Sequence, residues 1–132
     1  MYLLDTNAVI AALKGHAGLL ARIRGQKTQD VCVSSIVLHE LYYGAFRSAR
    51  LEANLERVDA LQFQVVDFDR EDARKAGEIR AVLSGSGSPI GPYDVLIAGQ
   101  ALSRELTLVS RNRREFVRVP DLRLEDWETV KS

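Results

Sequence analysis

The fold is decided by the stretch Tyr2-Leu3-Leu4-Asp5-Thr6-Asn7. Its three apolar residues predict a short buried strand, and Asp5 follows that strand immediately. From Thr6 to about Lys14 the pattern predicts a helix that ends near Gly15. In open α/β sheets the working site lies beyond the carboxyl ends of the strands. A strand followed at once by an acid and a helix therefore predicts an α/β protein with a polar site at this edge.

Strands and helices alternate along the rest of the chain. Val31-Cys32-Val33 reads as a second buried strand, with Ser34 or Ser35 as the N-cap of the helix that follows. We then expect a helix over Arg50–Leu61, a strand over Phe63–Phe68, a helix over Asp69–Leu83, a helix from Pro92 through about Arg104 with Gly91 as its N-cap, a strand over Leu106–Val109, and a shorter strand near Phe116-Val117. Such alternation predicts a mostly parallel sheet with helices on both faces.

Length and composition describe an ordinary globular domain. The 132 residues are 46% hydrophobic and 27% charged, which fits a single domain over residues 1–132. Eighteen basic residues balance 18 acidic ones, so any binding of a polyanion must come from local patches. No apolar stretch approaches the ~20 residues of a membrane span, and the N-terminus lacks the pattern of a signal peptide. We expect a cytoplasmic protein in which the lone Cys32 is a buried, inert thiol.

Several polar residues are expected at the carboxyl edge of this sheet. Asp5 follows the first strand, and Ser110, Arg111 and Asn112 follow the strand that ends at Val109. Asp94 stands in the first turn of a helix whose start faces the same edge. Each acid also has a structural explanation, because Asp5 is a good N-cap and Asp94 complements the helix dipole.

Glu40 is harder to explain by structure alone. Helical spacing places it at the margin of an apolar stripe, and no Lys or Arg stands three or four residues away to pair with it. Two like charges about 4 Å apart repel by about 4 kcal/mol at an effective dielectric of about 20. Three acids that meet would need protonation or a cation, and oxygen ligands suit magnesium or manganese. His16 and His39 stand apart from the acids, and we take both as structural or surface residues.

Four motifs, in this order, resemble those of PIN-domain ribonucleases and, more narrowly, of VapC toxins of VapBC toxin–antitoxin modules. They are Leu3-Leu4-Asp5-Thr6-Asn7, Ser34-Ser35-Ile36 with Glu40-Leu41-Tyr42-Tyr43-Gly44, Gly91-Pro92-Tyr93-Asp94 with Ile97-Ala98, and Arg114-Glu115-Phe116. The resemblance runs from residue 3 to about Trp127. It implies a three-layer α/β/α sandwich and a magnesium-dependent endoribonuclease toxin that hydrolyses phosphodiester bonds in tRNA or rRNA. It also implies a homodimer and a VapB-type antitoxin that blocks the active-site groove.

The resemblance assigns roles position by position. Asp5 and Asp94 match the acids that hold Mg²⁺, for which Mn²⁺ can substitute, and Glu40 matches the third catalytic acid. Asn112 stands where many PIN domains carry a fourth Asp; it can bind a metal through its carbonyl but adds no charge. Asn7 and Ser110 match supporting residues, although both also suit turns and caps.

The RNA contacts are less well defined by the motifs. Ser88 stands where similar sequences often carry a basic residue. Arg111, Arg113 and Arg114 are candidates to bind RNA instead, since Arg pairs well with phosphate, and a solvated basic turn is the alternative.

Two other functions compete with this one. A haloacid-dehalogenase-type phosphohydrolase would use Asp5 as nucleophile, but it needs a second Asp where this chain has Asn7. A non-catalytic PIN-like module that binds RNA or antitoxin is favoured by Asn112 and disfavoured by the three intact acids.

Overall fold

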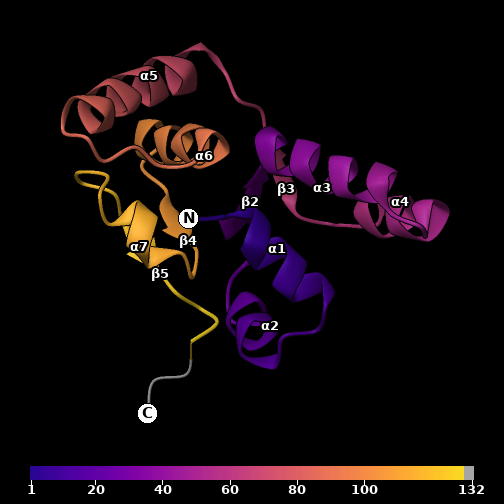
Figure 1. Cartoon of the computed structure of the whole chain (residues 1–132). Helices are drawn as coiled ribbons and strands as arrows, with labels where there is room; N and C mark the ends of the chain where they lie inside the picture. The colour runs from indigo at the N-terminus through magenta and orange to yellow at the C-terminus, as the bar shows by residue number, and fades with distance from the viewer. Residues whose placement is uncertain (130–132) are drawn as a thin grey trace.

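A five-stranded parallel sheet lies at the centre of the computed structural model, which describes residues 1–129 (Figure 1). The strand order is β3-β2-β1-β4-β5, and all neighbouring strands are parallel. Leu3 of β1 is in register with Cys32 of β2 on one side and Leu108 of β4 on the other. The strands are β1 (Tyr2–Leu4), β2 (Val31–Ser34), β3 (Gln64–Val66), β4 (Thr107–Val109) and β5 (Leu124–Glu125). The predicted parallel sheet is confirmed.

The helices join these strands in sequence order. They are α1 (Thr6–Leu13), α2 (Ala17–Arg24), the 3-10 turn η1 (Thr28–Asp30), α3 (Ser35–Arg47), α4 (Leu51–Asp59), α5 (Arg70–Gly85), α6 (Pro92–Ser103) and α7 (Arg113–Phe116). The helix α2 was not predicted. None of the helices within residues 1–129 is long and apolar enough to cross a membrane.

The last predicted strand, near Phe116-Val117, is wrong. Phe116 ends the short helix α7, and the Val117 N–H donates to the Arg113 carbonyl at 2.9 Å, as in a helical turn. Two apolar residues carry too little pattern to separate strand from helix, and here only Phe116 is buried while Val117 is exposed. The fifth strand forms later, at Leu124–Glu125.

The helices cover both faces of the sheet. The chain moves outward from β1 through β2 to β3, then returns across β1 to β4. Parallel crossovers are right-handed, so the helices before and after this return lie on opposite faces. Figure 1 accordingly shows α1 and α2 on one side of the sheet and α5 and α6 on the other. The result is the expected three-layer α/β/α arrangement.

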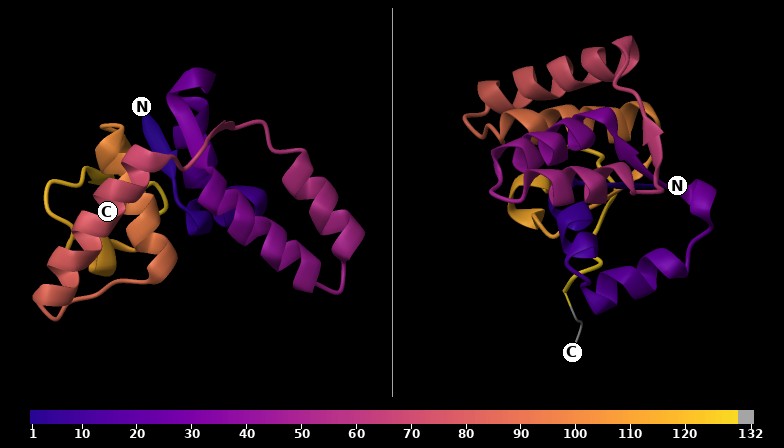
Figure 2. Two further views of the ribbon diagram at one scale, coloured as in Figure 1. Left: turned by 90° about the horizontal axis from the view of Figure 1, so that it is seen from above. Right: turned by 90° about the vertical axis from the view of Figure 1, so that its right-hand side faces the viewer.

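The helix α6 lies between α5 and the sheet, and its middle, from Ile97 to Ala101, is buried (Figures 1 and 2). Its close approach to α5 depends on Gly99, where an added Cβ would stand 2.6 Å from the Cα and Cβ of Ala76. Real atoms do not approach so closely, so a side chain at Gly99 would push the two helices apart. This glycine therefore sets the spacing between α5 and α6.

A buried polar cluster fixes the ends of the same two helices. Asp72 of α5 is 1% exposed and accepts hydrogen bonds from Arg104, Ser103 and Gln100. Burial alone would raise the pKa of Asp72, but the bonds from Arg104 and Ser103 hold it below its ordinary value. The cluster ties the start of α5 to the end of α6, and so fixes the direction in which α6 enters the sheet edge.

Cys32 is buried in β2, as expected. Its thiol donates to the Tyr2 carbonyl at 3.3 Å, and burial raises its pKa. A buried thiol with a raised pKa is a poor nucleophile.

Substitution of Gly99 by Ala should destabilise the chain by about 1–3 kcal/mol, because the new methyl group overlaps Ala76. Gly77 of α5 provides the matched control, since nothing lies within 4 Å of its added Cβ. There, Ala should stabilise the exposed helix by about 0.5–1 kcal/mol. Urea unfolding of both variants measures the two effects, and equal stabilities for Gly99→Ala and the parent would contradict the close packing of α5 and α6.

Candidate active site

Polar residues gather where the carboxyl ends of the strands meet. The order of the strands reverses between β1 and β4, and ligands of open α/β sheets bind at such a switch point. Asp5 follows β1 and its N–H donates to the Val109 carbonyl of β4 at 3.1 Å. Ser110 follows β4 and its N–H donates to the Glu125 carbonyl of β5 at 3.0 Å. Backbone bonds between neighbouring strands thus hold these loops in place.

Asp5 is both a helix cap and a buried acid. Its Oδ1 accepts the Ala8 N–H at 2.8 Å, so the structural explanation offered for it is correct. Yet the residue is 3% exposed, and burial raises the pKa of its carboxyl to about 6. Hydrogen bonds from Ser110 and Ala8 oppose this rise, whereas the charges of Glu128 and Glu40 add to it. Capping uses one oxygen and leaves a carboxylate that a cation would stabilise.

Asp94 lies in the first turn of α6, as predicted, and its pKa is raised to about 7. The largest cause is burial, followed by the side chain of Glu115 and the charges of Asp5 and Glu40. Near neutral pH, without a cation, Asp94 is partly protonated and can donate a hydrogen bond to Glu115. Helix-dipole complementarity alone would have lowered this pKa, so it does not account for the residue.

Glu115 is a residue of the site that our sequence reasoning did not assign. Its Oε1 accepts the Gly91 N–H at 3.2 Å and its Oε2 accepts the Asn112 side-chain amide at 2.8 Å. The hydrogen bond from Asp94 lowers the pKa of Glu115, so the proton of the pair rests on Asp94. Glu115 thus links the start of α6 to the loop after β4. The Arg114-Glu115-Phe116 motif was quoted in the sequence, and an acid three residues after Asn112 was the available signal.

Glu40 joins the group from α3. It is half-buried, and its charge raises the pKa of both Asp5 and Asp94. The negative charges of the three acids, predicted from separate parts of the chain, therefore interact with one another. Among residues 1–129, no ion pair involves Asp5, Glu40 or Asp94, so their repulsion is not relieved by a protein cation.

The acids fit a magnesium ion that keeps much of its water. Within the described residues, no three acids, histidines or cysteines close around one point as a ready-made metal cage. Mg²⁺ is usually held by one or two carboxylates, with water and substrate phosphate at its other positions. Buried Asp5 and half-buried Asp94, each with a raised pKa, provide two such oxygen ligands that gain from a divalent cation. The donor set suits an open magnesium or manganese site and offers nothing suited to zinc.

The remaining candidates separate into three groups. Ser110 and Asn112 lie at the acids: the Ser110 hydroxyl accepts the Asn112 N–H at 2.9 Å. Asn7 and Arg111 line an open groove beside Asp5. Arg113 and Arg114 are exposed on α7 and do not line that groove.

Both histidines have the structural or surface character expected of them. His16 caps α2, since its Nδ1 accepts the Leu19 N–H at 3.1 Å. His39 is exposed on α3, and its ring lies 5.5 Å from that of Tyr93.

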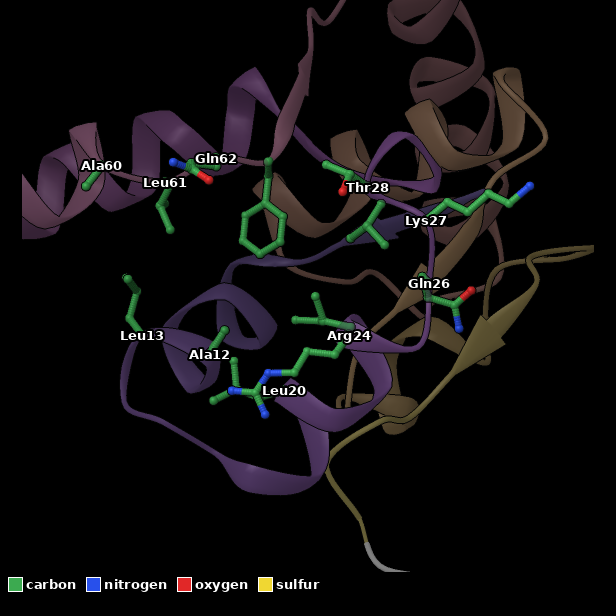
Figure 3. A pocket seen from close by; sticks show the side chains of 13 residues that line it. Ala12, Leu13, Leu20, Arg24, Gln26, Lys27, Thr28, Ala60, Leu61 and Gln62 are labelled. Carbon is green, nitrogen blue, oxygen red and sulfur yellow. The ribbon is translucent and has the colours of Figure 1, made fainter.

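A mostly apolar cavity lies elsewhere (Figure 3). It measures about 520 Å³ and opens near Val31, at the amino end of β2, with Leu20, Phe63 and other apolar side chains in its lining. None of the acids described above is among its lining residues. The acidic residues therefore lie at the opposite edge of the sheet from this cavity.

Three comparisons with known proteins show the family and the fold. A family model for the PIN domain matches residues 2–122. The tRNA(fMet)-specific endonuclease VapC of Salmonella typhimurium is 43% identical over 96% of this chain and 97% of its own, and ribonuclease VapC2 of Haemophilus influenzae is 41% identical over the same shares. The crystal structure of DNA-bound VapBC from Salmonella typhimurium covers 96% of this chain and 97% of its own with a TM-score of 0.90 at 43% identity. VapBC2 from Rickettsia felis, bound to a promoter DNA fragment, gives a TM-score of 0.89 at 34% identity, with coverage of 96% and 98%.

The raised pKa values predict how the stability of the metal-free chain depends on pH. The folded chain binds the protons of Asp5 and Asp94 more tightly than the unfolded chain does, so their contribution to stability falls as pH rises from 3.8 to about 7. Asp94→Asn should therefore stabilise the metal-free chain at pH 8 by at least about 1 kcal/mol, since one pKa unit equals about 1.4 kcal/mol. Urea unfolding at pH 5 and 8 in the presence of a chelator measures this. A loss of stability at pH 8 in the variant would show that Asp94 is not repelled in the folded chain.

Proposed function

This chain belongs to the PIN-domain family and, within it, to the VapC ribonucleases, and we propose that it is the RNA-cleaving toxin of a toxin–antitoxin pair. The observation that carries the proposal is a pair of carboxylates, buried Asp5 and half-buried Asp94, whose pKa values are both raised at one edge of the sheet. Without a cation, such a pair does not stabilise the folded chain near neutral pH. It matches the chemistry of a metal-dependent nuclease.

We propose that the enzyme depends on Mg²⁺ and that Asp5 and Asp94 hold the ion. A bound magnesium ion would polarise a phosphoryl oxygen and lower the pKa of water at the site. Glu40, on the opposite helix, positions the attacking water and accepts its proton. The water oxygen would then form a bond to phosphorus while the P–O bond opposite to it breaks, and the ribose oxygen that leaves would take a proton from solvent.

The supporting residues keep the acids in position. Glu115 holds the Gly91 N–H at the start of α6, so it fixes the turn that carries Asp94. Asn112 is held between Glu115 and the Ser110 hydroxyl. We assign Asn112 an uncharged role at the edge of the site, Ser110 and Asn7 the support of Asp5, and Arg111, Arg113 and Arg114 the attraction of RNA.

The substrate is proposed to be a structured RNA, either tRNA or rRNA. A relative that is 43% identical over nearly the whole chain is named as specific for tRNA(fMet), so this tRNA is the first candidate. Its cleavage would stop the initiation of translation and explain toxicity in a cytoplasmic protein.

The proposed partner is a VapB-type antitoxin, because several similar structures are complexes of VapC with VapB. An antitoxin encoded beside this chain should co-purify with it and suppress its RNA cleavage. Cleavage that persists in the stable complex would contradict neutralisation by the partner.

We also propose that the chain forms a homodimer. Tyr43 and Phe46 on α3 are 57% and 64% exposed, and Leu51 at the start of α4 is 38% exposed. An apolar surface of this kind is a candidate for contact with a second copy. Light scattering should report a dimer that Phe46→Ser weakens. Val82, which is 53% exposed on α5, provides the control, and an equal effect of Val82→Ser would place the contact elsewhere.

Loss of either metal-holding acid should abolish RNA cleavage. In a magnesium-containing assay with tRNA(fMet), Asp5→Asn and Asp94→Asn should each lower the cleavage rate by at least about a hundredfold, because removal even of a partner that only orients a metal ligand costs about 10–100-fold. Glu105→Gln changes an exposed acid that precedes β4, at the amino edge of the sheet, and should leave the rate unchanged.

Chelation should stop the parent enzyme, and added Mg²⁺ or Mn²⁺ should restore it. Unaltered cleavage by purified, folded Asp94→Asn would contradict the proposed function. It would leave a role in binding RNA or antitoxin as the alternative.

A further inference from the structure

An open groove leads away from the acids at Asp5. It measures about 530 Å³, and its polar lining consists of Asn7, Lys14, His16, Arg111 and Glu128. These residues come from α1 and the turn after it, from the loop after β4, and from the segment that follows β5. The groove therefore joins the carboxyl edge of the sheet to the end of α1.

Two residues of the groove are neighbours of the acidic site in sequence. Asn7 is two residues from Asp5, and Arg111 follows Ser110, which hydrogen-bonds to Asp5. Lys14 also lines a second, smaller groove of about 250 Å³ that contains Glu40. Lys14 thus borders both the groove that contains Asn7 and Arg111 and the groove that contains Glu40.

Glu128 is held at the groove by an anchored segment. The Trp127 side chain before it is 4% exposed, with its ring 4.8 Å from Tyr2. The Asp126 Oδ1 accepts the Glu128 N–H at 2.9 Å. The charge of Glu128 also raises the pKa of Asp5. The placement of this acid is therefore fixed by the fold.

Two cations face one acid in this groove. Among residues 1–129, no ion pair involves Lys14, Arg111 or Glu128, so the cations are available to a ligand. A chain of phosphates fits this pattern, because Lys and Arg bind phosphate oxygens and fix the position of a nucleic-acid backbone without reading its sequence. An RNA strand whose phosphate reaches Asp5 and Asp94 must leave the site across the neighbouring surface, and the groove is such a surface.

We propose that this groove binds the RNA backbone on one side of the phosphate that is cut, with Lys14 and Arg111 on phosphates and Glu128 as a like charge that limits affinity. The inference rests on the proposed function and extends it to Lys14 and Glu128, which the sequence did not indicate for this role. It also separates Arg111 from Arg113 and Arg114, which the sequence grouped with it but which lie outside the groove.

Because the groove holds charges of both signs, removing a positive or a negative charge should change kcat/KM in opposite directions. With tRNA(fMet) as the probe and Mg²⁺ present, Lys14→Gln should lower kcat/KM roughly fivefold at low salt, mainly through KM. Glu128→Gln should raise kcat/KM about twofold. One lost phosphate contact should make the plot of log kcat/KM against log salt shallower by about 0.7, so the effect of Lys14→Gln should shrink about 2.5-fold between about 50 and 200 mM salt. The Mg²⁺ concentration that gives half-maximal activity should not change in Lys14→Gln.

Lys75→Gln is the matched control, because Lys75 lies on α5 and pairs with Glu78 away from the groove; it should leave kcat/KM unchanged. If the parent cuts neither this tRNA nor rRNA with Mg²⁺ present, the proposed function itself is wrong. If the parent cuts it and Lys14→Gln and Glu128→Gln match the parent at every salt concentration, only the groove is wrong. Changes of the same sign in both variants, or a loss of antitoxin binding without a change in kcat/KM, would likewise overturn it.

Discussion

Repulsion between carboxylates that the fold keeps partly out of water is the constraint on which the rest of the site depends. Asp5 is fixed by its bond to β4 and by its cap on α1, so it cannot move away from the sheet edge. Asp94 is fixed because α6 is wedged between α5 and the sheet, with Gly99 against Ala76 and Asp72 bonded to Arg104. The packing of two helices on one face thus determines the charge density at the strand ends. A fold that holds acids together in this way favours the binding of a cation, because the cation relieves their repulsion.

The fold could be predicted where local signals agree with the tertiary structure. Tyr2-Leu3-Leu4 followed by a capping Asp5 has only one simple interpretation, and strand, cap and helix formed as expected. The error at Phe116-Val117 arose where the pattern was only two residues long, and burial of Phe116 from a helix satisfied it equally well. The strand β5 has two residues and is defined by its hydrogen bonds to β4, which no local pattern contains.

The site was predictable to a similar extent. The reasoning that acids follow parallel strands located Asp5, and the lack of cationic partners singled out Glu40. Glu115 was missed because its importance lies in contacts with Gly91 and Asn112, and the first of these lies 24 residues away in sequence. Glu128 was missed for the same reason, since it reaches the edge only after β5 pairs with β4. Sequence spacing indicates which residues share an edge of the sheet; which of them contact one another depends on packing.

Protons released on metal binding provide the most direct test of the central claim, that Asp5 and Asp94 repel each other until a divalent ion binds. Calorimetric titration of the chain with Mg²⁺ or Mn²⁺, in buffers of different ionisation enthalpy, counts these protons. Because ligands must be deprotonated to bind, and the pKa values of Asp5 and Asp94 are about 6 and about 7, binding at pH 6.5 should release about one proton and at pH 9 almost none. Asp94→Asn should lose most of this release together with the affinity. Metal binding that releases no protons at pH 6.5, or that is unchanged in Asp94→Asn, would contradict the account.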